Sequence, residues 1–152
     1  MSNTTENLAA AHADVKAEIA RTDNKIALLL ALATGLLALA WTVGGKISFS
    51  SGFGIAAAIV GGIGTGLALW AISALLSGVR PNLKGNHGFT LWATLTPEQV
   101  TEHAAARDLS ADVAGLSRLA VAKYCAIQRA VDLLRVGGAL LILAALLALG
   151  SA

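Results

Sequence analysis

Three long runs without a charged side chain constrain this chain more than any other feature. They cover residues 26–43, 52–76 and 136–149. A helix that crosses the hydrocarbon core of a bilayer needs about 20 mostly apolar residues, because lipid offers no partner for an unpaired backbone amide. The composition agrees, since 56% of the residues are hydrophobic and only 13% are charged, against about 25% in an average soluble domain. We therefore predict an all-α membrane protein with three transmembrane helices.

Basic residues are distributed unevenly around these spans. Three precede the first span and seven lie between the second and third, whereas the first turn contains Lys46 alone. By the positive-inside rule, residues 1–25 and 77–135 face the cytoplasm, residues 44–51 form an outer turn, and the C-terminus lies outside. The expected location is the inner (plasma) membrane, as a multi-pass protein. A cleavable signal peptide does not fit, because the residues before the first span carry charges of both signs.

Residues 1–25 predict an amphipathic helical arm. Leu8, Val15, Ile19 and Ile26 follow one another at spacings of seven, four and seven, which places them on one side of a helix. Neither proline nor glycine occurs before Gly35. The arm is therefore predicted to continue without a break into the first span.

The segment 77–135 predicts two further helices. Thr96 as N-cap, Pro97 at the first helical position and Gln99 closing a capping box predict a helix that ends near residues 107–108. Ser110 is the predicted N-cap of a second helix, which continues into the third span for about 39 residues, close to 60 Å. Its apolar positions repeat in a three-four pattern that includes Lys123. We expect its cytosolic half to pack on the N-terminal arm as a cytosolic helical bundle.

Small residues predict close helix packing in the second span. Ala58, Gly62 and Gly66 stand four residues apart, and such rows let helix backbones approach closely in lipid. A tight hairpin or an oligomer seam is expected here, and we expect a homo-oligomer. The GGIGTG run in this span is not a dinucleotide fingerprint, since no strand precedes it and no acidic residue follows at the usual distance.

The sequence contains no catalytic motif. There is no nucleophile–base pair with the expected context, no HExxH and no phosphate loop. His12, His87 and His103 fall on three separate elements, and the single Cys125 excludes an intramolecular disulfide. We therefore expect neither an enzyme nor a metal site, and no binding of nucleic acid.

Charged residues stand where the first and third helices meet lipid. Arg21, Asp23 and Lys25 precede the first span, and Arg129 and Asp132 precede the third. One hypothesis is an interhelical polar lock that fixes register and can be opened by a signal, because a buried carboxylate at this depth requires a partner. The alternative is that the arginines reach lipid phosphates and the carboxylates face water.

A second set of basic residues could bind an anion. Arg80, Lys84, Arg118 and Lys123, with His87, supply donors suited to a phosphate. The positive-inside bias accounts for the same residues, so the two interpretations remain open.

The sequence also resembles a known family. EIARTDNKIALLL, with Arg21, Asp23 and Lys25 leading into the first span, and LSRLAVAKYCAIQRA before the third look like the Pycsar effectors, small bacterial membrane proteins. The likeness extends over residues 18–149.

The resemblance implies an effector of antiphage defence that acts with a nucleotide cyclase. Cyclic CMP or cyclic UMP would activate it, bound directly or through a partner protein, since this chain has no strand-rich segment like the nucleotide-binding domain of some members. Activation would impair the inner membrane. Some relatives are labelled as integral membrane plasmid-transfer proteins, so a scaffold that binds a partner through its cytosolic helices is the alternative. A monomeric transporter is disfavoured, because the spans lack charge.

Overall fold

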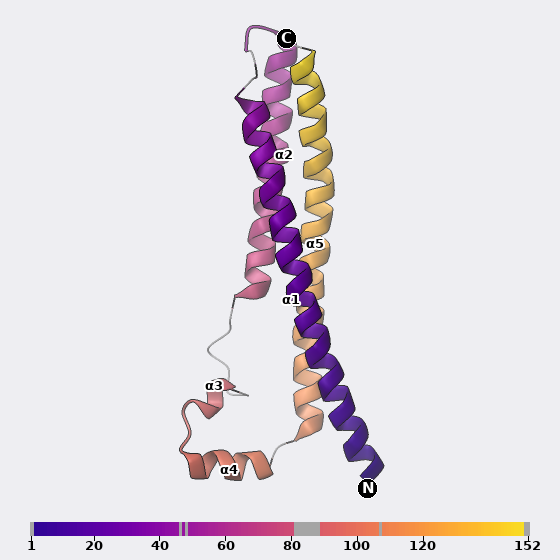
Figure 1. Cartoon of the computed structure of the whole chain (residues 1–152), viewed down its shortest axis with the longest axis vertical. Helices are drawn as coiled ribbons and strands as arrows, with labels where there is room; N and C mark the ends of the chain where they lie inside the picture. Colours follow the sequence, from indigo (N-terminus) through magenta and orange to yellow (C-terminus); the bar gives the residue numbers. More distant parts are fainter. Residues whose placement is uncertain (1, 46, 48, 81–88, 107, 151–152) are drawn as a thin grey trace. The chain divides into compact units, whose positions relative to one another are not determined.

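The computed structural model describes residues 2–45, 47, 49–80, 89–106 and 108–150. Within these residues the regular structure is entirely helical (Figure 1): α1 (Ser2–Gly44), α2 (Gly52–Val79), α3 (Phe89–Trp92), α4 (Pro97–Ala105) and α5 (Leu109–Leu149). Three of these helices, α1, α2 and α5, are long and apolar enough to cross a membrane. The all-α prediction with three membrane-spanning helices is therefore confirmed. The predicted continuity of the first and third spans with their flanking helices is also found.

The chain forms two compact units. We call Arg21–Val79 with Ala122–Ala152 the three-helix unit, and Met1–Ala20 with Arg80–Val121 the arm-and-loop unit. Both α1 and α5 contribute to each unit. The packing of the arm on α5 as a cytosolic bundle stays a prediction.

In the three-helix unit, α2 contacts its neighbours along a heptad-like row of small residues. Its buried positions are spaced by three, seven, four, three and four residues, as in left-handed helix packing. They are Gly54, Ala57, Gly64, Ala68, Ala71 and Leu75. Because all but one are glycine or alanine, the neighbouring backbones can approach closely, which is how helices associate in lipid.

The tightest approach joins α2 to α5 at two glycines. A Cβ added at Gly64 would lie 2.9 Å from the carbonyl oxygen of Gly137, and one added at Gly137 would lie 3.0 Å from that of Gly64. Added Cβ atoms at Gly62 and Gly66 would meet nothing within 4 Å. The close contact within one chain thus uses Gly64, and the predicted role of Ala58, Gly62 and Gly66 in an oligomer seam stays a prediction.

The core of the three-helix unit draws on all three helices. Its buried residues are Ile26, Ala33, Ala68, Ala71, Leu75, Ala130 and Leu134. An added Cβ at Gly78 would lie 3.5 Å from the Cβ of Ala126 and 3.8 Å from the Cδ1 of Ile26. These contacts place Ile26 of α1, Gly78 of α2 and Ala126 of α5 at one level of the bundle.

In the arm-and-loop unit, α4 begins with the predicted capping box. The backbone N–H of Gln99 donates to Thr96 Oγ1 at 3.4 Å, and that of Thr96 donates to Gln99 Oε1 at 3.0 Å. Pro97 is the first residue of the helix. The helix ends at Ala105, close to the predicted end. The residues Phe89–Trp92 before it form the short helix α3, which the sequence pattern did not predict.

The predicted cap of α5 is wrong by two residues. Asp108, not Ser110, caps the helix: its Oδ1 accepts from the N–H groups of Ser110 and Ala111 at 2.9 and 3.3 Å, and from Ser110 Oγ at 2.6 Å. Ser110 therefore acts as a donor, and a carboxylate can accept all three bonds at a position where the helix N-terminus favours negative charge. The Ser110 hydroxyl first, and then the two backbone N–H groups, lower the pKa of this carboxyl.

Candidate functional site at the membrane boundary

A polar cluster joins α1 to α5 where the apolar part of the three-helix unit begins. Lys123 Nζ forms an ion pair and hydrogen bond with Asp23 Oδ1. The Lys123 side chain is only 12% exposed, whereas that of Asp23 is 48% exposed. Water therefore screens this pair less than it screens two charges that are both on the surface.

A second contact lies beside it. Lys25 Nζ donates to the hydroxyl of Tyr124 at 3.2 Å and lies 5.2 Å from the centroid of the ring. This distance is within the range of cation–π attraction. We call the four residues Asp23, Lys25, Lys123 and Tyr124 the boundary clamp.

Helical spacing explains why these four residues meet. Lys123 occupies a position of the three-four pattern that continues through Ile127, Ala130 and Leu134. Its alkyl chain can lie along the contact between α1 and α5 while its ammonium group reaches Asp23. Long basic side chains commonly do this at the edge of an apolar region. Lys25 reaches Tyr124, the next residue of α5.

The boundary clamp includes only part of the predicted polar lock. Asp23 and Lys25 do contact α5, but through Lys123 and Tyr124 and not through Arg129 and Asp132. Both of the latter are exposed, and within the described residues no side-chain hydrogen bond or ion pair is found for either. Arg21 has an interaction of its own. The outward position of residues 129 and 132 follows from the pattern, because Ile127, Ala130 and Leu134 face inward.

The predicted anion-binding residues are divided between the two units. Arg80 and Arg118 are exposed residues of the arm-and-loop unit, whereas Lys123 belongs to the three-helix unit and pairs with Asp23. Lys84 and His87 lie outside the described residues. A site for an anion that uses these residues stays a prediction.

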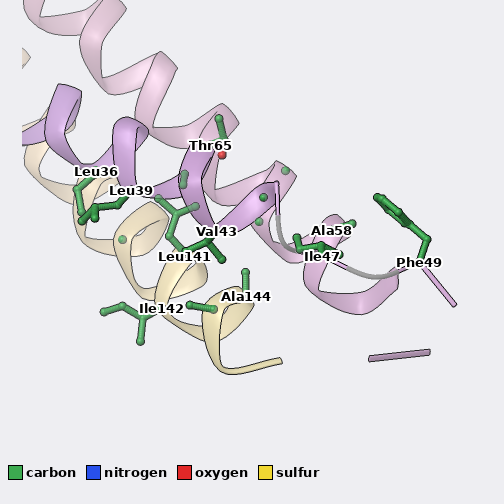
Figure 2. Close-up of a pocket in the computed structure, with 16 residues that line it drawn as sticks. Leu36, Leu39, Val43, Ile47, Phe49, Ala58, Thr65, Leu141, Ile142 and Ala144 are labelled. Atoms are coloured by element: carbon green, nitrogen blue, oxygen red, sulfur yellow. The ribbon is translucent and has the colours of Figure 1, made fainter. Parts of the chain in front are cut away.

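One pocket of the three-helix unit is apolar. It has a volume of about 470 Å³ and is lined by α1, α2, α5 and the turn between α1 and α2. Figure 2 shows its labelled side chains, of which only Thr65 carries a polar atom. None of the described residues that line it has a charged side chain, and recognition of a phosphate relies on charged or N–H donors. This pocket therefore suits hydrocarbon and not a cyclic nucleotide.

Residues 7–150 match a family model described as the Pycsar effector protein domain. The match includes both units and every residue of the boundary clamp. No curated protein and no solved structure matches the chain.

Proposed function

The chain belongs to the Pycsar effector family, and on this premise we propose that it impairs the integrity of the inner membrane when a cyclic pyrimidine nucleotide signals infection. Membership supports an effector of antiphage cyclic-nucleotide signalling in general, in a family of non-enzymatic effectors, and three helices of this chain are long and apolar enough to cross a membrane. The inner membrane, the cytoplasmic N-terminus and a functional link to a nucleotide cyclase are parts of the proposal. The positive-inside distribution of basic residues supports the orientation.

The boundary clamp is the observation that supports the mechanism best. It joins the two helices, α1 and α5, that continue from the apolar bundle into the segments predicted to be cytosolic. A change in those segments would reach the spans through unbroken helices. We infer that the clamp stabilises the resting arrangement, and that its release lets α1 and α5 move apart and disturb the bilayer.

The messenger would be cyclic CMP or cyclic UMP. Its phosphate is anionic, and Arg80, Lys84 and Arg118 are the donors predicted to face the same compartment. Lys123 is engaged with Asp23, so an anion that competes for Lys123 would also weaken the clamp. Sensing by a partner protein that then binds the cytosolic segments is the alternative route to the same release.

The test is inducible expression in cells that carry a membrane-potential dye, with and without a cognate cyclase that supplies cyclic CMP or cyclic UMP. The proposal expects depolarisation only when the messenger is made. Asp23→Lys should depolarise cells without the cyclase, because it places two cations together at the clamp. The charge-swap variant Asp23→Lys with Lys123→Asp is the matched control and should restore dependence on the messenger.

Two results would count against the proposal. Membrane potential that is unchanged under every condition, with retained binding of a partner by the cytosolic helices, would favour the plasmid-transfer or scaffold function. Depolarisation that is equal with and without the messenger, and equal in the clamp variants, would show that the clamp does not control activity.

A further inference from the structure

The outward face of α5 carries charge inside the part of the helix that packs in the apolar bundle. Cys125, Arg129 and Asp132 follow one another at spacings of four and three, which places them on one side of the helix. Arg135 follows three residues later, and all four residues are exposed. Ala130 and Leu134, on the opposite side, are buried in the core.

The register of the bundle shows how deep these charges lie. Ala126 is level with Ile26, where the uncharged run of α1 begins. At a rise of 1.5 Å per residue, Asp132 lies about 9 Å and Arg135 about 14 Å further along the helix axis. Between residues 26 and 44, α1 carries no charged residue. The charges of α5 are therefore level with residues of α1 that require a hydrocarbon environment.

The adjacent surface of α2 carries two serines beside a tryptophan. Trp70, Ser73 and Ser77 line a groove with Arg129 and Asp132. The same stripe of α2 continues through Gly66 and Gly62, since the spacings from Gly62 through Gly66 and Ser73 to Ser77 are four, seven and four. Added Cβ atoms at Gly62 and Gly66 would meet open space. We call the charged residues of α5 and this groove, together with the glycines that continue the stripe of α2, the outward polar face.

Lipid is a poor neighbour for this face. A charged residue at the centre of a membrane helix costs about 3 kcal/mol by insertion scales, and such residues almost always face protein or water. Small residues on the same face are typical of helix–helix contacts in membranes. Both observations indicate that another protein surface packs against this face.

We propose that the outward polar face is the interface between copies of this chain. The face is self-complementary, because each copy brings a carboxylate, Asp132, between two guanidinium groups, Arg129 and Arg135. In parallel copies these residues stand at equal depth, so Asp132 of one copy can reach an arginine of its neighbour, one turn above or below. Hydrogen bonds between a guanidinium group and a carboxylate can be bidentate, and they are strong where water is excluded. This inference requires the membrane setting but not the proposed effect on membrane integrity.

A phospholipid headgroup is the rival occupant. Its phosphate would accept bonds from Arg129 and Arg135, but Asp132 between them would repel it, and Arg135 stands about 14 Å along the helix axis from the level at which the uncharged run of α1 begins. The second copy satisfies all three charges at once.

Cys125 provides a native reporter, since it lies on this face close to the membrane boundary and is exposed. Copper-phenanthroline oxidation of the full chain in isolated membranes should form a disulfide-linked dimer through Cys125. The matched control carries Cys125→Ser with Leu28→Cys, an exposed position of α1 that is 65% exposed and lies near the same boundary. It should form much less dimer. Carbonate-washed membranes verify that each variant remains inserted.

Charge variants distinguish a second copy of the chain from a phospholipid headgroup at this face. Asp132→Asn should reduce the cross-linked fraction by about three- to tenfold, the effect of roughly 0.6 to 1.4 kcal/mol at an interhelical polar contact. The double variant Arg129→Asp with Asp132→Arg keeps complementary charges and should restore cross-linking. The proposal is overturned if Leu28→Cys cross-links and Cys125 does not, or if Asp132→Asn leaves the product unchanged. It is also overturned if Asp132→Asn lowers cross-linking only in vesicles that contain phosphatidylglycerol, because loss of the carboxylate would then act by admitting lipid phosphate and not by removing a contact between copies.

Discussion

Lys123 illustrates how one charged side chain can occupy a helix seam at the edge of a membrane. Its position repeats with apolar residues of α5, and its charge is balanced by Asp23 of α1. The sequence predicted the three-four pattern, the polar character of Asp23 and Lys25, and the capping box at Thr96. It did not predict which residues of α1 contact which residues of α5, because the order of charges along the chain does not determine the register between two helices. Residue type alone also could not place the cap of α5 at Asp108, since serine and aspartate both cap helices.

Removing the ion pair should have a modest effect on stability. A double-mutant cycle measures the interaction energy of the pair from the variants Asp23→Ala, Lys123→Ala and the combination of both. We expect a coupling of about 0.5–1 kcal/mol, because Asp23 is about half exposed and solvent weakens such pairs. Unfolding of the purified protein in mixed micelles with increasing SDS measures it. The same cycle with Asp132 in place of Asp23 should give no coupling, and equal couplings would contradict the assignment.

The cap of α5 should depend on pH. The folded-state pKa of Asp108 is below its ordinary value of 3.8, since the Ser110 hydroxyl and the N–H groups of Ala111 and Ser110 donate to the carboxylate. Its stabilising contribution is therefore complete above the ordinary pKa and is lost as the pH falls through the lower folded-state pKa. Hydrogen exchange at the first amides of α5, corrected for intrinsic rates, should rise severalfold in that window.

Asp108→Asn is the control for this experiment. Asparagine keeps an acceptor but does not titrate, so the first turn should remain protected at neutral pH and lose its dependence on acid. Asp108→Ala should expose the same amides at every pH. Identical exchange in all three proteins would mean that Asp108 does not cap the helix.

At the scale of elements, side-chain size decides which face of α2 turns inward. The second span is apolar on all sides, so polarity gives no direction, and the sequence identified the glycine-rich helix without identifying the face that packs in the bundle. The packed positions are small, whereas Ile55, Ile59 and Ile63 are exposed. Large apolar residues can face lipid without a cost in free energy. The heptad spacing of small residues was therefore the signal that could have identified the packed face of α2.

Gly64→Ala should weaken the contact between α2 and α5. Its methyl group would lie 2.9 Å from the Gly137 carbonyl oxygen, so the backbones must shift, at a cost of about 1–3 kcal/mol as for other overpacked sites. Gly35→Ala is the matched control, because an added Cβ there meets nothing within 4 Å and alanine favours a helix by about 0.5–1 kcal/mol over glycine. Resistance to unfolding by SDS should therefore fall for the first variant and not for the second.

The whole molecule combines two units that share α1 and α5. The three-helix unit supplies the apolar seam, the boundary clamp and the outward polar face, and the arm-and-loop unit carries Arg80 and Arg118. The sequence predicted the three spans because the length and lack of charge of each run are set by the bilayer. The sequence alone does not show which surfaces of two copies contact each other. The cross-linking experiment above tests that contact.

The central claim is that the chain crosses the membrane three times with its basic segments in the cytoplasm. The direct measurement places single cysteines at Asp14, Leu32, Phe49 and Glu102 in a Cys125→Ser background and labels them with an impermeant maleimide. In intact spheroplasts only the cysteine at Phe49 should react. Those at Asp14 and Glu102 should react after permeabilisation, and the one at Leu32 in neither case. Labelling at Glu102 from outside, or at Leu32 in water without detergent, would contradict the account.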